Sequence, residues 1–210
     1  RFIELVRYAT NLQSQKPQRL TNYLWLLSEM SDYVADLQPN DGELLSLIQK
    51  GNLRLGYSFP FPVAMKVFPE SIRADAFAET LDSVTPKSLP QELIRVPFSY
   101  EEPIDEATQK VMLAAMSDGI DAALQDNYLR YCSYYMPRSG TVLACPENIE
   151  LATKMLDLLI ADKVMKRESN IAKMAQIVKG MMLFQNGSKE DGIALVFKTG
   201  SPFETASDSY

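Results

Sequence analysis

Acidic side chains are the densest group in this sequence that could carry out chemistry. They form two groups, the first made of Glu101, Glu102, Asp105 and Glu106 and the second of Asp118, Asp121 and Asp126. Clustered carboxylates can bind Mg²⁺ or Ca²⁺, or act as general acids and bases. Their spacing matches neither an EF-hand loop nor a paired acidic motif. We therefore interpret them as a solvated helix face and predict no metal site, with a carboxylate- or metal-dependent enzyme kept as an alternative.

The 210 residues contain no histidine, which is the side chain that most often serves as a general base or metal ligand near neutral pH. Cys132 could act as a nucleophile only beside a base or cation that lowers its pKa, and only Arg130 and Arg138 are close to it in sequence. We predict no catalytic residue and no cofactor. Cys132 and Cys145 could form a disulfide in an oxidising compartment, or remain small buried hydrophobic residues in a reducing one.

The segment from Tyr128 to Arg138 has the most distinctive composition, with four tyrosines and two arginines in eleven residues. Tyrosine and arginine are enriched at protein interfaces, and aromatic rings also stack on single-stranded bases. Core packing is the third interpretation, because helical spacing turns Tyr128, Tyr131 and Tyr135 inward and leaves Tyr134 outside. Methionine lines grooves that accept varied partners, and one of two adjacent methionines is expected at the surface. The predicted partner-binding residues are Tyr134, Arg138, Arg130, Met181 and Met182.

The charge balance restricts the classes of partner. Lysine and arginine number 21 against 27 acidic residues, which gives a net charge of −6. Sequence-independent affinity for nucleic acid comes from basic side chains that neutralise phosphates, so this composition argues against a nucleic-acid partner. No apolar run approaches the roughly 20 residues that a transmembrane helix needs, so no membrane insertion is expected. The sequence begins with Arg1, from which we expect a processed form or an excised segment.

The first half of the chain alternates between helical and period-two patterns. Apolar residues at helical spacing predict three helices before residue 52 and a short helix from about 70 to 83. Alternation over residues 53 to 59 and over residues 93 to 100 predicts two half-buried strands. Because Pro97 cannot donate a hydrogen bond to a neighbouring strand, the second strand is expected at a sheet edge. Seven of the twelve prolines lie between Pro60 and Pro103, which marks an irregular region.

The second half is predicted to be helical. One apolar stripe predicts a long helix from about Pro103 to Met136, through Leu113, Met116, Ile120, Leu124, Tyr128, Tyr131 and Tyr135. Further helices are expected over residues 146–166, 170–185 and 188–199. The last two resemble a tetratricopeptide hairpin through the small and aromatic residues Gly180, Ala194, Phe197 and Pro202. Their spacings do not superimpose on that repeat's consensus, and the sequence has no second copy. Because such repeats normally need three or more copies to be stable, a solenoid is kept only as a minor alternative.

These patterns predict a mainly α-helical protein, built as a multi-helix bundle or an irregular helical array, and they leave open a small two-stranded β element. The expected organisation within one compact domain is an N-terminal helical segment (1–56), a proline-rich irregular or β segment (57–103), a C-terminal helical segment (104–200) and a flexible tail (201–210). We predict a non-enzymatic structural or adaptor subunit whose helical faces bind other protein chains, self-association included. The alternatives are the enzyme above and a nucleic-acid-associated packaging or replication component.

Overall fold

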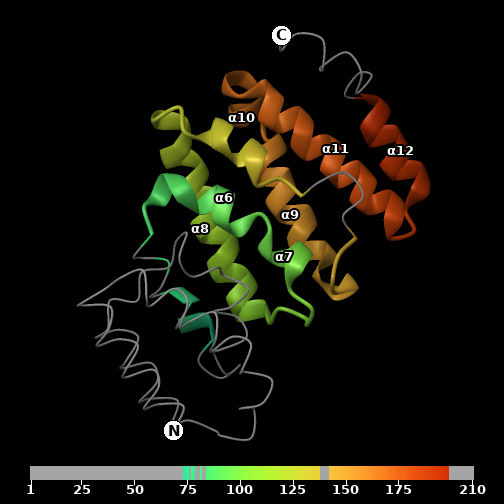
Figure 1. Ribbon diagram of the computed structural model, residues 1–210, viewed down its shortest axis with the longest axis horizontal. Helices are drawn as coiled ribbons and strands as arrows, with labels where there is room; N and C mark the ends of the chain where they lie inside the picture. Colours follow the sequence, from blue (N-terminus) through green and yellow to red (C-terminus); the bar gives the residue numbers. More distant parts are fainter. Residues whose placement is uncertain (1–72, 76, 79–80, 82–83, 138–141, 199–210) are drawn as a thin grey trace, which may run out of the picture. The chain divides into compact units, whose positions relative to one another are not determined.

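Helices account for most of the residues that the computed structural model describes, which are residues 73–75, 77–78, 81, 84–137 and 142–198 (Figure 1). This part of the chain contains no strand, so the prediction of a mainly α-helical protein is confirmed for it. None of its helices combines the length and apolarity needed to cross a membrane. The three helices predicted before residue 52 and the strand predicted over 53–59 lie outside the described residues.

The chain divides into two units, residues 1–85 with 105–112 and residues 86–104 with 113–210. In the first unit, Asp105 caps helix α8 (Glu106–Gln125). Its carboxylate accepts hydrogen bonds from the backbone N–H of Thr108 at 2.9 Å and from the Thr108 hydroxyl at 2.7 Å. Arg73 lies 3.7 Å from the same carboxylate. These bonds satisfy an N–H of the first turn and place negative charge at the positive end of the helix dipole.

Helix α8 ends well before the predicted boundary. Asn127 adopts the left-handed conformation with φ of 53°, and the N–H of Tyr128 donates to the carbonyl oxygen of Ala123 at 2.8 Å. This is the Schellman arrangement, in which asparagine replaces glycine after the last helical turn. A separate 3₁₀ helix, η2 (Leu129–Tyr134), follows. The prediction of one continuous helix through this region was therefore wrong.

The strand predicted over residues 93–100 is also wrong, because the structure has two short helices there, α6 (Leu89–Leu93) and α7 (Val96–Ser99), which follow the 3₁₀ turn η1 (Pro86–Ser88). Proline stands in the first turn of both α-helices, where its missing N–H would have no intrahelical partner. Arg95 and Ser99 are exposed and four positions apart, so both fall on one helix face. The residues between and around them are buried, namely Leu93, Ile94, Val96, Pro97, Phe98 and Tyr100.

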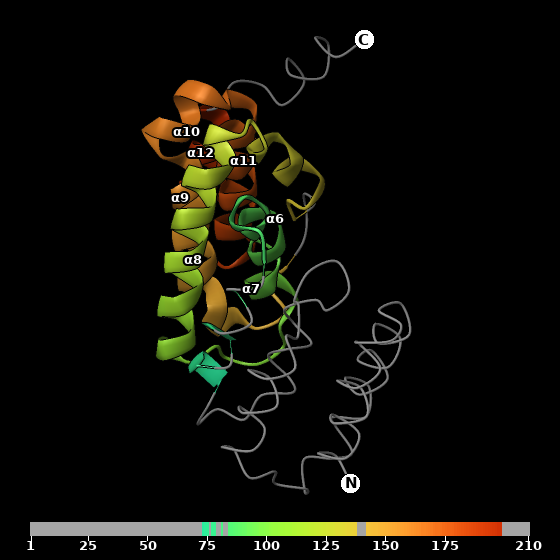
Figure 2. The ribbon, with the colours of Figure 1, turned by 90° about the vertical axis from the view of Figure 1, so that its left-hand side faces the viewer.

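The second unit continues through η3 (Pro146–Asn148), α9 (Ile149–Ile160), α10 (Asp162–Arg167), α11 (Ser169–Gln185) and α12 (Lys189–Lys198). The helix predicted over 146–166 breaks at Ala161, whose ψ of 149° is extended. No proline or glycine marks this break, and it allows Val164 to turn into the core with no exposed surface. The helices predicted over 170–185 and 188–199 are confirmed within the described residues. Helix α11 packs against α9, α10 and α12, and both views show these helices together (Figures 1 and 2).

Asn148 is a fully buried polar residue directly before α9. Its side-chain oxygen accepts a hydrogen bond from the backbone N–H of Ile104 at 2.9 Å. Its amide nitrogen donates to the carbonyl oxygens of Glu102 at 3.0 Å and Tyr100 at 3.5 Å. One side chain therefore satisfies backbone groups of the segment before α8 and fixes that segment against the start of α9.

Gln91 differs from Asn148, because its side chain is 4% exposed and has no hydrogen-bond partner among the residues that the structure describes. An unpaired buried amide destabilises a protein by about 1–3 kcal/mol. We expect Gln91→Met, which keeps the length and removes the polar atoms, to raise the free energy of unfolding by about 1 kcal/mol. Urea unfolding checks this result. A loss of stability would show that the amide is paired in solution.

Candidate functional site

Two glycines bring the backbones of α11 and α12 into contact. A Cβ atom on Gly180 would lie 2.8 Å from the carbonyl oxygen of Gly192 and 2.7 Å from Cγ2 of Val196. A Cβ atom on Gly192 would in turn overlap the carbonyl oxygen of Gly180 and lie 2.7 Å from the backbone nitrogen of Phe184. Because these neighbours are mostly backbone atoms, they cannot move aside as a flexible side chain would. The two helices therefore cross at a point where only glycine fits.

The turn between the two helices holds them antiparallel. Gly187 adopts φ of 100°, and the N–H of Ser188 donates to the carbonyl oxygen of Leu183 at 3.0 Å, which is again a Schellman ending. The Asn186 side-chain amide donates to the carbonyl oxygen of Met182 at 2.8 Å. The Asn186-Gly187 sequence thus forms the turn between the two helices, and this turn fixes the hairpin that carries the candidate site.

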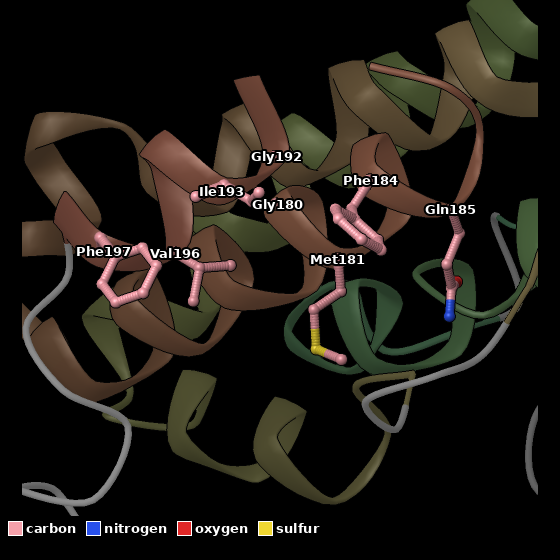
Figure 3. Close-up of a pocket in the computed structure, with 8 residues that line it drawn as sticks. All are labelled: Gly180, Met181, Phe184, Gln185, Gly192, Ile193, Val196 and Phe197. Atoms are coloured by element: carbon pink, nitrogen blue, oxygen red, sulfur yellow. The ribbon is translucent and has the colours of Figure 1, made fainter. Parts of the chain in front are cut away.

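An apolar groove with a volume of 290 Å³ lies along this hairpin (Figure 3). Its lining residues come from α11 and α12, and they are Gly180, Met181, Phe184, Gln185, Gly192, Ile193, Val196 and Phe197. Three large apolar side chains on the groove are exposed to an unusual degree: Phe184 by 44%, Ile193 by 46% and Phe197 by 76%. Adjacent exposed apolar groups of this kind mark interaction surfaces on water-facing proteins.

The groove is suited to apolar side chains of another protein. Gln185 is the only polar side chain among its eight lining residues, whereas small-molecule sites combine apolar walls with several polar groups that orient the ligand. Its volume of about 290 Å³ is also slightly below the roughly 300–1,000 Å³ typical of such sites. Covering an exposed phenylalanine or isoleucine fully would contribute about 1.5–3 kcal/mol, so Phe197 and Ile193 have the most to gain from a partner.

The two predicted methionines have different environments. Met181 is half-buried and lines the groove, while Met182 is 1% exposed and packs in the core. Met181 is therefore the accessible member of the pair, whereas Met182, which was also predicted to bind a partner, is covered by the core; partner binding by Met181 stays a prediction. Its unbranched side chain can adapt to the shape of an incoming group.

The tyrosine-rich segment is at the surface only in part. Tyr134 is 81% exposed, as predicted, and Arg130 is exposed with its guanidinium 5.2 Å from the centre of the Tyr131 ring. Tyr131 is 37% exposed, so the prediction that it faces the core was wrong. The reason is the ending of α8, because η2 has three residues per turn and does not continue the predicted stripe. Arg138 lies outside the described residues.

Cys132 and Cys145 are both free and buried thiols. Burial raises the pKa of the Cys132 thiol from 9.0 to about 12. The pKa of Cys145 is also raised, first by the hydrogen bond from its Sγ to the Glu147 carboxylate at 3.0 Å and then by burial. These environments are the reverse of the electropositive, exposed setting that activates a cysteine.

We expect Cys132 to make stability depend on alkaline pH. The thiol of an unfolded chain ionises near 9.0, whereas the folded thiol stays protonated to about 12. The contribution of the protonated Cys132 thiol to the free energy of unfolding is therefore complete below pH 9. It decreases by about 1.4 kcal/mol per pH unit as pH rises from 9 toward 12. Urea unfolding from pH 8 to pH 10 measures the slope, and Cys132→Ala should reduce it. An equal slope in both proteins would contradict the expected result.

The predicted acidic face takes part in ion pairs. Asp121 lies 2.6 Å from the ammonium group of Lys163, and Asp126 lies 2.8 Å from that of Lys87. Within the described residues, no three acidic or cysteine side chains are close enough together to hold a metal ion. Asp121 and Asp126 thus form surface ion pairs, which contribute little stability individually.

Sequence reasoning missed Phe184 and Ile193 as site residues, and it assigned Phe197 and Gly180 only to a hairpin resemblance. A usable signal was present, since apolar residues occur on every side of α11. A helix of this kind must be covered on more than one face. Phe197 follows Ile193 by one turn on the neighbouring helix, which places a second apolar strip beside it.

Similarity to known proteins gives no indication of function. The chain matches no family model, no curated protein and no solved structure.

Proposed function

We propose that this chain is a non-enzymatic structural or adaptor subunit that binds other protein chains through the apolar face of the α11–α12 hairpin. The observation that supports it is the groove, with Phe184, Ile193 and Phe197 exposed along one surface. An antiparallel helix pair presents a trough into which a third helix can pack with its own apolar stripe. We also propose that partner helices packed on the hairpin extend the helices of this chain into a larger multi-helix array.

Affinity capture from the native source tests this function. We expect the double variant Ile193→Glu/Phe197→Glu to lose captured partners that the unmodified chain retains, because two buried charges would have to be desolvated in the complex. Val142→Glu is the matched control, since Val142 is 60% exposed and lies outside the groove. Capture at about 1 µM keeps weak self-association out of the measurement.

The proposal fails if the double variant Ile193→Glu/Phe197→Glu captures the same proteins as the Val142→Glu control. Circular dichroism and hydrogen exchange of α12 should show that both variants keep the hairpin, because all three substituted positions are already exposed to solvent.

A further inference from the structure

The turn between α11 and α12 contains a reactive pair of residues. Asn186 is the only asparagine in the sequence that is followed by glycine. In such a pair the backbone nitrogen of the glycine can attack the side-chain amide of the asparagine, because glycine has no Cβ to obstruct the approach. Gly187 and Ser188 are exposed, and a Cβ atom added to Gly187 would have no neighbour within 4 Å. Water therefore has free access to this turn.

The folded turn keeps the reacting atoms apart. Asn186 has ψ of 20°, so the nitrogen of Gly187 nearly eclipses the backbone nitrogen of Asn186 and lies away from its Cβ. Ring closure requires the Gly187 nitrogen on the Cβ side, which means that the Cα–C bond of Asn186 must rotate. Two hydrogen bonds oppose this rotation, one from the Asn186 amide to the carbonyl oxygen of Met182 at 2.8 Å and one from the N–H of Ser188 to that of Leu183 at 3.0 Å.

We propose that Asn186 is a deamidation site whose reaction is controlled by opening of the α11–α12 hairpin. In the open turn, the backbone nitrogen of Gly187 forms a bond to Cγ of Asn186. The Cγ–Nδ2 bond breaks, the proton of the Gly187 N–H passes to the leaving nitrogen, and ammonia is released. Water then opens the succinimide ring at either of its two carbonyl groups, which leaves aspartate or isoaspartate at position 186. Water is the only co-reactant.

Neither product can rebuild the turn. A carboxylate cannot donate a hydrogen bond to the carbonyl oxygen of Met182, and it adds negative charge at the C-terminal end of α11, where the helix dipole is already negative. Isoaspartate also inserts a methylene group into the main chain, which moves the N–H of Ser188 away from the carbonyl oxygen of Leu183. Deamidation thus makes a brief opening of α12 permanent.

Peptide mapping by mass spectrometry of the 210-residue chain tests the site. In urea at mildly alkaline pH, we expect residue 186 to change its mass by the difference between an amide and a carboxyl group, and to yield both aspartate and isoaspartate. Asn127 is the internal control, because it also follows a helix but precedes Tyr128, and it should stay intact over the same period. Asn186→Gln should give no product at position 186. An unmodified Asn186 in urea overturns the proposal.

Control by the hairpin is tested by comparing two rates. Deamidation of Asn186 should be slower in the folded chain than in urea by the factor that protects the Ser188 amide from hydrogen exchange, within about fivefold, because both reactions need the open turn. A synthetic peptide of residues 183–190, measured in both solutions, corrects for the effect of urea on the chemistry. Equal rates in the folded and unfolded chains overturn the proposal, and so does a larger mismatch with the protection of Ser188.

The effect of the product is tested with Asn186→Asp, which supplies the aspartate form directly. Amides of α12 should lose hydrogen-exchange protection severalfold in this variant, while amides of α9 keep theirs. Asn127→Asp is the matched control, since it adds the same charge after α8 and should leave α12 unchanged. Full protection of α12 in Asn186→Asp would show that the hairpin survives the modification, and this would contradict the permanent opening.

Discussion

Replacing Gly192 by alanine is expected to detach α12 from α11. The added methyl group would meet the carbonyl oxygen of Gly180 and the backbone nitrogen of Phe184, so the two helices would have to separate. Overpacking of this kind costs about 1–3 kcal/mol, while the better helix propensity of alanine returns about 1 kcal/mol. Because α12 packs mainly on α11, the loss should appear as local opening rather than global unfolding.

Native-state hydrogen exchange checks this result. Amides of α12 should lose protection severalfold in Gly192→Ala, while amides of α9 keep theirs. Ala194→Ser is the matched control, because Ala194 is an exposed residue of the same helix and its change should stay within about 0.5 kcal/mol. Unchanged protection of α12 in Gly192→Ala would contradict the close contact of the two backbones.

Asn148→Asp is expected to destabilise the second unit by about 3 kcal/mol or more at pH 7. The introduced carboxylate would still accept from the N–H of Ile104, but it could not donate to Glu102 and would face that carbonyl oxygen as a buried charge. Asn148→Ser is a useful comparison, since its shorter side chain removes the bonds to both Ile104 and Glu102 without adding charge. It should cost less than the aspartate variant at pH 7.

The dependence of this effect on pH follows from the same burial. Desolvation raises the pKa of the introduced carboxyl in the folded chain above its unfolded value of about 3.9. The loss in free energy of unfolding, relative to the unmodified protein, should therefore be small below pH 4, where the introduced carboxyl is protonated and can donate a hydrogen bond. This loss should grow as pH rises. Urea unfolding of both proteins at pH 4 and pH 7 measures it. An equal deficit at both values would show that charge is not the cause.

Much of the helical content could be predicted from the sequence, but several boundaries could not. Helices over 170–185 and 188–199 follow from apolar spacing and from the Asn-Gly turn between them. The alternation over residues 93–100 was ambiguous, because Arg95 and Ser99 are four positions apart. This spacing equals two repeats of a period-two strand pattern and also about one turn of a helix. In the structure these residues form helices, and most of the side chains between and around Arg95 and Ser99 are buried. The left-handed Asn127 ended α8 although the apolar stripe continued beyond it.

The candidate site was predicted less completely than the helices. The sequence indicated Tyr134 and one of the two methionines Met181 and Met182 as surface residues, and in the structure Tyr134 is exposed and Met181 is half-buried. The groove depends instead on the contact between Gly180 and Gly192, which lie on different helices. Periodicity within one helix reports which face is covered, but it does not report how closely two backbones approach. Phe184 and Phe197 could therefore be assigned to a common surface only from the structure.

Hydrogen exchange of the complex with a captured partner tests the central claim most directly. Deuterium uptake of peptides covering residues 180–185 and 193–197 should slow severalfold in the complex, since the partner would exclude water from the groove and suppress opening of α12. Uptake in η2, around Tyr134, should stay as it is in the free chain. Slower exchange confined to η2, with no change in α11 and α12, would contradict binding through the hairpin.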